Sequence, residues 1–114
     1  MNTQYIIILV TAKDKKEAEK IARGLLESKL IACANIVEGI QSLFWWRGKI
    51  DSSKEVLLIL KTKKSFFKKI SIKVKSLHSY QTPEIIALPI INGSKDYLAW
   101  ISMSIGPIPS KSKK

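Results

Sequence analysis

The sequence has little of what would place a protein outside the cell or in a membrane. Its single cysteine, Cys33, cannot close an internal disulfide, so nothing calls for an oxidising compartment. The N-terminal Met1–Gln4 lacks the basic stretch of a secretory signal. The apolar run 5–10 is short for a signal core and far below the about 20 residues that cross a bilayer. We therefore expect a soluble, cytoplasmic protein with no membrane partner.

Signatures of catalysis are also missing. The sequence contains no Gly-rich phosphate loop, no H-E-x-x-H string and no Cys-x-x-Cys pair. Cys33 and the single histidine, His78, form the one thiol–imidazole combination, and no third group that would orient them suggests itself. The sequence therefore predicts a protein that is not an enzyme.

What the sequence does contain is the pattern of one compact domain. With 114 residues, 46% of them hydrophobic, it is long enough for one core and too short for two. The expected elements, in chain order, are a strand at 4–12, a helix at 14–28, a long hairpin at 30–62 with a bend at 38–39 and a polar turn at 47–53, a helix from Ser65 to His78, a strand at 84–91 and a short helix after Ser94.

Several single residues support these boundaries. Asp14 is placed to cap the first helix, and Glu17, three residues later, would complete a capping box. Ser65 is placed to cap the second helix and Ser94 the third. Pro89 cannot donate to a strand ladder, which predicts an edge strand or a bulge there.

The order of elements predicts an α+β fold, a ferredoxin-like β-α-β-β-α-β sandwich with a short C-terminal helix. We expect a single domain over 1–105 and a flexible basic tail over 106–114. Two helices would cover one sheet face and leave the other bare, and the aromatic residues Phe44, Trp45 and Trp46 would lie on the projecting hairpin. Exposed aromatics beside a bare sheet predict a partner, most simply further copies in a closed oligomer.

The net charge is strongly positive, at +11, because the sequence contains 20 lysines and arginines but only nine acidic residues. The segment between Val56 and Thr82 has no acidic residue but contains these lysines: Lys61, Lys63, Lys64, Lys68, Lys69, Lys73 and Lys75. A nucleic-acid-binding module is one interpretation, but modules of this fold stack bases on aromatics of the central strands, and the string EVLLILKT (55–62) has none. The pattern favours a solvated helix face, and we do not expect a nucleic-acid partner.

Six strings, in this order and spacing, resemble the CutA family of divalent-cation tolerance proteins over nearly the whole chain. They are TAKD (11–14), LIACANIV (30–37), SLFWWRGK (42–49), EVLLILKT (55–62), HSYQTPEIIALPI (78–90) and DYLAWI (96–101). The resemblance implies a homotrimer, no enzymatic reaction, and a link to tolerance of copper and other divalent cations. It also implies likeness to the PII signalling proteins, which bind small effectors between subunits.

The resemblance also assigns metal candidates. His78 aligns with the histidine of the family's H-x-Y-x-x-P-E motif, which implies a ligand for Cu²⁺ or another divalent cation, with Cys33 and Glu84 as secondary candidates. Copper-binding relatives place a further cysteine and histidine where this chain has Val10 and Leu77. Without the resemblance, His78 would be taken as a partner of a helix C-terminus and Cys33 as a buried, inert thiol.

A second group of candidates concerns assembly. In the family the hairpin that here carries Phe44, Trp45 and Trp46 reaches a neighbouring subunit. The residues that would surround a cleft between subunits, where a small anion or effector binds, are Lys61, Tyr80, Glu84, Tyr97 and Trp100. An effector-binding scaffold is therefore the alternative to a direct metal binder.

Overall fold

The computed structural model describes residues 4–106 and contains eight elements. They are β1 (Tyr5–Ala12), α1 (Lys15–Glu27), β2 (Cys33–Trp46), β3 (Lys49–Lys63), the 3-10 turn η1 (Lys64–Phe66), α2 (Phe67–Leu77), β4 (Ile85–Pro89) and α3 (Lys95–Ser104). The strands form one antiparallel sheet in the order β2-β3-β1-β4. This confirms the predicted ferredoxin-like fold. Of the predicted tail, 107–114 lies outside the described residues.

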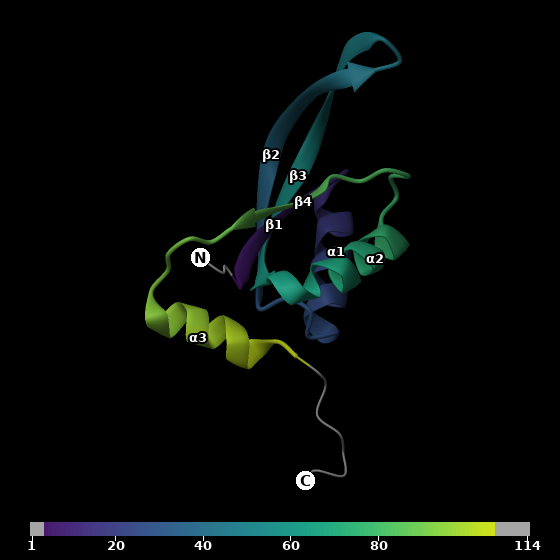
Figure 1. The fold of residues 1–114 in the computed structure, drawn as a ribbon. Coiled ribbons are helices and arrows are strands. Elements are labelled where there is room, and N and C mark those ends of the chain that lie inside the picture. Colours follow the sequence, from purple (N-terminus) through teal and green to yellow (C-terminus); the bar gives the residue numbers. More distant parts are fainter. Residues whose placement is uncertain (1–3, 107–114) are drawn as a thin grey trace.

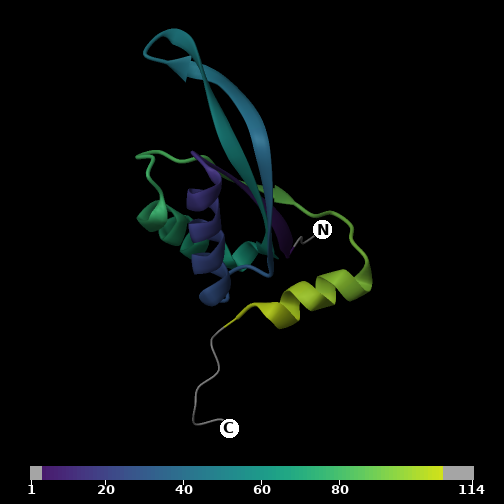
Figure 2. The same cartoon turned by 180° about the vertical axis from the view of Figure 1, so that it is seen from behind.

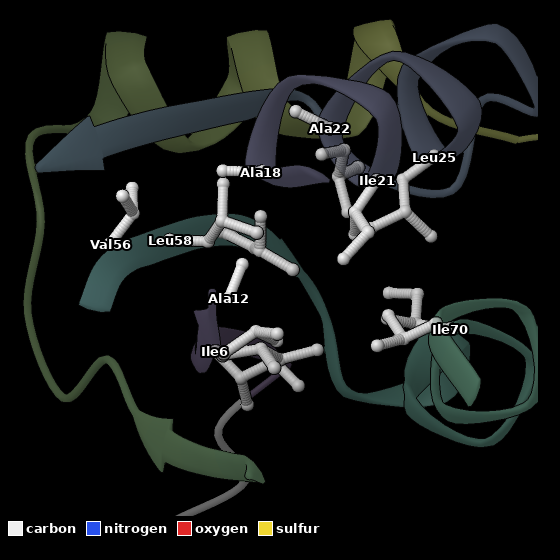
Figure 3. Close-up of a cluster of buried hydrophobic side chains, with 14 residues drawn as sticks. Ile6, Ala12, Ala18, Ile21, Ala22, Leu25, Val56, Leu58 and Ile70 are labelled. Carbon is white, nitrogen blue, oxygen red and sulfur yellow. The ribbon is translucent and has the colours of Figure 1, made fainter. Parts of the chain in front are cut away.

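The core lies between the sheet and the helices α1 and α2. Alternate residues of β1 and β3 point to the helices, and Ile8, Leu58 and Leu60 are fully buried there. They meet apolar residues from both helices, among them Ile21 and Ile70 (Figure 3). Full burial of such side chains contributes about 1.5–3 kcal/mol each, so this layer dominates the stability of the protomer.

The other face of the sheet has no helical layer along most of its length (Figure 1). We call this surface the open face, and its apolar members are Ile7, Leu9, Val37, Leu57, Ile59, Ile86 and Leu88. Ile86 and Leu88 on β4 are 50% and 47% exposed. The prediction of one covered and one bare sheet face is therefore confirmed.

The hairpin of β2 and β3 projects well beyond the rest of the sheet (Figures 1 and 2). Its two strands are joined by Arg47 and Gly48, whose φ angles are 51° and 78°. Two successive positive φ angles match the twist of a tight hairpin. The predicted turn over 47–53 is therefore too long: 49–53 are paired strand, and their polarity reflects exposure beyond the core.

A bulge bends this hairpin near its base. The register between β2 and β3 shifts between Val37 and Ile40, and Gly39 has a φ of 78°. A glycine at positive φ is the usual device for an extra residue in one strand. The bend predicted at 38–39 is confirmed.

The helix caps agree with the sequence in two cases of three. Asp14 accepts a hydrogen bond of 2.8 Å from the Glu17 amide, and Ser94 accepts one from the Tyr97 amide. Ser65 does not cap α2, because it lies inside η1, and Phe66 precedes the helix with no side-chain cap. The chain therefore enters α2 through a tighter turn that the sequence pattern did not indicate.

The last strand is shorter than the predicted 84–91, but its position is as expected. β4 pairs only with β1, so Pro89 lies on an edge strand. After β4 the chain crosses to α3, which lies at the end of the sheet away from the hairpin tip (Figures 1 and 2). Ile101 of α3 is fully buried against Ala32, and the Tyr5 and Ser102 hydroxyls are 2.6 Å apart.

Within residues 4–106, no helix is both long enough and apolar enough to cross a membrane.

Candidate functional site

His78 ends helix α2, and its side chain is completely buried. Its Nε2 lies 2.7 Å from the carbonyl oxygen of Thr11, and its Nδ1 lies 3.0 Å from the amide nitrogen of Tyr80. A carbonyl only accepts and a backbone amide only donates, so we assign the proton to Nε2. Both ring nitrogens are therefore used by hydrogen bonds within the protomer.

Glu17 lies beside this histidine. Its carboxylate accepts from the amides of Lys13, at 3.1 Å, and Ser79, at 2.7 Å. Burial raises the pKa of Glu17, but the hydrogen bonds from Ser79 and Lys13 outweigh it, and the pKa is lowered overall. The distance from its carboxylate to His78 Nδ1 is 3.9 Å, which is not an ion pair in the tautomer assigned above.

Tyr80 extends this cluster to the base of the hairpin. Its ring packs on the His78 ring, with centroids 4.7 Å apart, and its hydroxyl donates to the Glu55 carboxylate at 2.8 Å. Burial and the adjacent Glu55 carboxylate raise the pKa of Tyr80, so the phenol stays protonated as a donor. We call His78, Glu17, Tyr80 and Glu55 the loop cluster.

A second group of polar side chains lies towards the other end of the sheet. Lys61 of β3 pairs with Cys33 of β2, and its Nζ donates to the side-chain oxygen of Asn35. The Cys33 thiol is 3.9 Å from the same oxygen. Burial raises the pKa of Tyr97, and the Cys33 thiol adds to that rise. The Tyr97 and Trp100 rings are 5.4 Å apart.

The predicted cleft residues are thus divided between separate places in one protomer. Lys61 bonds to Asn35, Tyr97 and Trp100 pack together on α3, and Tyr80 belongs to the loop cluster. Glu84 is exposed just before β4. A single cleft that includes all of these residues stays a prediction, and it requires a second protomer.

The predicted metal ligands do not converge either. Lys61, the strand partner of Cys33, pairs with Ile7, whereas His78 bonds to Thr11, four residues further along β1. At about 3.3 Å per residue, this separation is more than 10 Å. Residues 4–106 hold no group of three or more His, Cys, Asp or Glu side chains placed for a metal.

The other two positions of the family's copper ligands are part of the core. Val10 is fully buried, and Leu77 packs against the same core cluster. Cys33 is half-buried, so the prediction of a buried thiol does not hold for this protomer.

The two tryptophans of the hairpin are the most exposed aromatic residues of the predicted set. Trp45 is 74% exposed and Trp46 56%, and the Arg47 guanidinium lies 5.5 Å from the Trp46 ring centre. Their exposure in one protomer agrees with the predicted interface role but does not test it.

Sequence reasoning missed two members of the loop cluster. Glu17 was assigned only to a helix cap, and Glu55 was not singled out. Their partners, Ser79 and Tyr80, are 62 and 25 residues away along the chain, so no local pattern could reveal these contacts.

The fold and the open sheet face define an α+β protein of ferredoxin-like topology with one apolar sheet face that no helix covers along most of its length. Residues 6–104 match the CutA1 divalent ion tolerance protein family. The chain therefore belongs to the CutA1 family, as the sequence strings predicted.

Individual relatives agree over most of the chain. The divalent-cation tolerance protein CutA of Thermus thermophilus is 41% identical over 100 residues, which cover 88% of this chain and 97% of that protein. The chloroplastic CutA 1 of rice is 42% identical over 99 residues, and the match spans only 56% of its length. The solved structure of Archaeoglobus fulgidus CutA has a TM-score of 0.87 at 45% identity, covering 90% of this chain and 99% of that one.

These relatives correct one prediction. The Archaeoglobus protein is described as periplasmic and the rice protein as chloroplastic. The prediction of a cytoplasmic protein, which was based on the lone cysteine and the missing signal and span, is therefore contradicted. None of these three features fixes the compartment of a small α+β domain.

Proposed function

We propose that this protein acts in tolerance of divalent cations, copper among them, as a homotrimer that catalyses no reaction. The observation that carries the proposal is the match to the CutA1 divalent ion tolerance family over residues 6–104, nearly all of the described chain. Relatives that share about four-tenths of their residues with this chain bear the same description.

The open face supports assembly. Ile86 and Leu88 are about half exposed on a sheet face that no helix covers along most of its length (Figure 1). Trp45, next to the hairpin turn, is 74% exposed. Each exposed apolar side chain contributes about 1.5–3 kcal/mol when it is fully buried. A closed ring of identical subunits would bury this surface in every copy.

Sedimentation analysis of the intact protein tests the trimer. We expect three times the 12.9 kDa chain mass. Leu88→Lys places a charge on the open face and should shift the mass towards one chain. Ile72→Lys is the matched control, because Ile72 is 63% exposed on α2, away from the open face. A wild-type mass of one chain contradicts the trimer, and equal effects of both substitutions contradict assembly through the open face.

The role in tolerance is tested in cells. A bacterium from which its own CutA has been deleted would be grown with graded Cu²⁺, Zn²⁺ and Co²⁺, with and without this chain. We expect the chain to restore growth at cation concentrations that inhibit the deletion strain. Unchanged growth, with the chain present at normal levels, contradicts the proposal.

How the cation acts has two candidate answers. Direct binding of Cu²⁺ or another divalent cation by His78, Cys33 and Glu84 needs groups from a second protomer, because these residues do not converge in one chain. The alternative is a PII-like scaffold that responds to a small effector. The half-exposed rings of Tyr97 and Trp100 and the Lys61 ammonium on the open face support this second function.

A further inference from the structure

Helix α2 carries an apolar side chain on the side that points furthest from the core. Ile70 and Val74 are fully buried in the core, and Ile72 lies midway between them in the sequence. Two residues turn an α-helix by about 200°, so Ile72 points away from the core, and it is 63% exposed. A single exposed isoleucine is ordinary on a protein surface, so its neighbours decide what it indicates.

The neighbours of Ile72 are lysines. Lys68 precedes it by four residues and Lys75 follows it by three, so both lie on the same side of the helix, and both are exposed. Residues 56–83 include no aspartate or glutamate, and neither ion pair among the described residues includes a lysine of α2. Positive charge is therefore concentrated here without a partner in the protomer. We call the exposed residues of this surface the lysine face: Lys64, Lys68, Lys69, Ile72 and Lys75.

The lysine face lies on the side of the molecule opposite the open face. Helices α1 and α2 cover one side of the sheet, and the lysine face is part of the outer surface of that layer (Figures 1 and 2). A ring of subunits closed through the open face does not use this surface. Its availability therefore does not depend on the proposed trimer.

Helix α1 borders the lysine face and limits it. A Cβ at Gly24 of α1 would lie 3.8 Å from Cε of Lys73, so this lysine stem runs along α1. Lys20, one turn before Gly24, is exposed and adds positive charge, but α1 also carries the exposed acids Glu19 and Glu27. The positive charge is therefore densest over α2.

The composition of the lysine face indicates the kind of polyanion that it fits. Helix α2 has no arginine, whose planar fork suits bidentate contacts to single phosphates, and Phe66 and Phe67 pack against the core, where no base can stack on them. The centre of the face is instead the aliphatic side chain of Ile72. The backbone of a nucleic acid offers this side chain no apolar contact, whereas the boundary between lipid headgroups and acyl chains does.

We propose that the lysine face docks on the surface of a membrane that contains anionic lipids. The ammonium groups lie among the headgroups, and Ile72 enters the boundary with the acyl chains. Each lysine close to an anionic leaflet strengthens such binding by about fivefold, so the four lysines together supply a few hundredfold, roughly. This contact needs neither a signal nor a span, the features whose absence led us to expect no membrane partner.

Co-sedimentation of the full-length protein with lipid vesicles tests the contact. Vesicles of phosphatidylcholine alone are compared with vesicles that also contain phosphatidylserine. We expect the protein to sediment with the anionic vesicles, to stay in solution with the neutral ones, and to be released as salt is raised, because salt screens exposed charges. Duplex DNA and polyglutamate, tested by gel shift, are the other polyanions and should bind more weakly.

Two pairs of lysines separate the lysine face from attraction by the net charge. The double variant Lys68→Gln/Lys75→Gln removes the neighbours of Ile72 and should weaken vesicle binding by about tenfold or more. Lys54→Gln/Lys95→Gln removes the same charge from exposed positions on the hairpin and α3, and should weaken it by less than about threefold. Glutamine keeps a helix propensity close to that of lysine, and equal melting temperatures confirm that both variants fold.

Ile72 separates a lipid surface from the other polyanions. Ile72→Ser keeps every charge and should weaken vesicle binding by about threefold or more, because an apolar side chain no longer enters the membrane. Ile72→Leu should retain binding. DNA and polyglutamate should bind the wild type and Ile72→Ser alike.

Four results would overturn the proposal. They are no sedimentation with anionic vesicles at low salt, equal sedimentation with neutral ones, equal losses in the two double variants, and unchanged vesicle binding by Ile72→Ser. If the protein binds DNA or polyglutamate through Lys68 and Lys75 but does not bind vesicles, the lysine face belongs to that polyanion instead.

Discussion

The Tyr80 hydroxyl donates to the Glu55 carboxylate across 2.8 Å, which ties the loop after α2 to the base of the β2–β3 hairpin. The Tyr80 ring also packs on His78, whose Nε2 holds the end of β1 through Thr11. Three segments far apart in the sequence are thus joined by one chain of contacts. The hairpin that carries the exposed tryptophans starts from this junction.

Loss of this hydroxyl should weaken the protomer. Tyr80→Phe removes the donor and leaves the half-buried Glu55 carboxylate without it, which we expect to cost about 1–2 kcal/mol of unfolding free energy. Urea denaturation measures the difference. A double-mutant cycle with Glu55→Gln isolates the pair, because the second substitution should cost less once the first is made. Additive effects of the two substitutions would show that the pair does not interact.

The Glu17 carboxylate should make stability depend on acidity. Its pKa is lowered in the folded state from 4.5, because the hydrogen bonds from Ser79 and Lys13 outweigh the opposing effect of burial. The unfolded chain therefore binds the proton more readily than the folded one. This contribution is fully present above about pH 4.5 and is lost as the pH falls through the lower, folded-state pKa.

Glu17→Gln tests this dependence. The amide keeps an acceptor but cannot titrate, so the unfolding free energy of the variant should vary less with pH below 4.5 than that of the wild type. Glu19→Gln, on an exposed position of the same helix, is the control and should leave the wild-type dependence intact. Urea denaturation from pH 3 to 7 makes the comparison, and parallel wild-type and Glu17→Gln curves would contradict the assignment.

The sequence predicted the layers of the fold through the order of its strands and helices, which local patterns reveal. The apolar runs of β1 and β3 are continuous, so the sequence alone does not show that Ile8 and Leu58 are the residues that face the helices. The Asp14 cap was visible in the sequence, because donor and acceptor are three residues apart. The turn prediction was wrong where the apolar pattern ends. Asp51 and Ser52 resemble turn residues, but they are paired strand that extends past the core.

The polar contacts could not be predicted in the same way. The bonds from His78 to Thr11 and from Ser79 to Glu17 join residues 67 and 62 positions apart. From the sequence alone, many other acceptor groups could receive these hydrogen bonds equally well. Only the packing of α1 against α2 decides which pair meets, so a histidine that the family pattern marks as a ligand is found here with both nitrogens engaged.

The end of α1 offers a stabilising substitution. Lys29 has a φ of 57°, and the bonds Lys29 N–H to Leu26 O and Leu30 N–H to Leu25 O complete a helix-ending motif that favours glycine. Lys29→Gly should raise the unfolding free energy by about 0.5–1 kcal/mol, because it relieves the left-handed strain. The same change at Lys20, exposed inside the helix, should lower it by about 1 kcal/mol. Thermal melting compares the two, and destabilisation by Lys29→Gly contradicts the argument.

The sharpest question about metal concerns His78. A Cu²⁺ ion needs a nitrogen lone pair, and the one on Nδ1 already accepts from the Tyr80 amide. If Nδ1 bound a metal instead, the buried N–H of Tyr80 would lose its acceptor, at a cost of about 1–3 kcal/mol. We expect calorimetric titration with Cu²⁺ to give the same isotherm for the wild type and for His78→Gln, whose amide can still donate to Thr11. Cys33→Ser, assayed in parallel, should also leave it unchanged. Saturable binding that disappears in His78→Gln, while the variant melts as a trimer, would instead show that assembly reopens the histidine as a ligand.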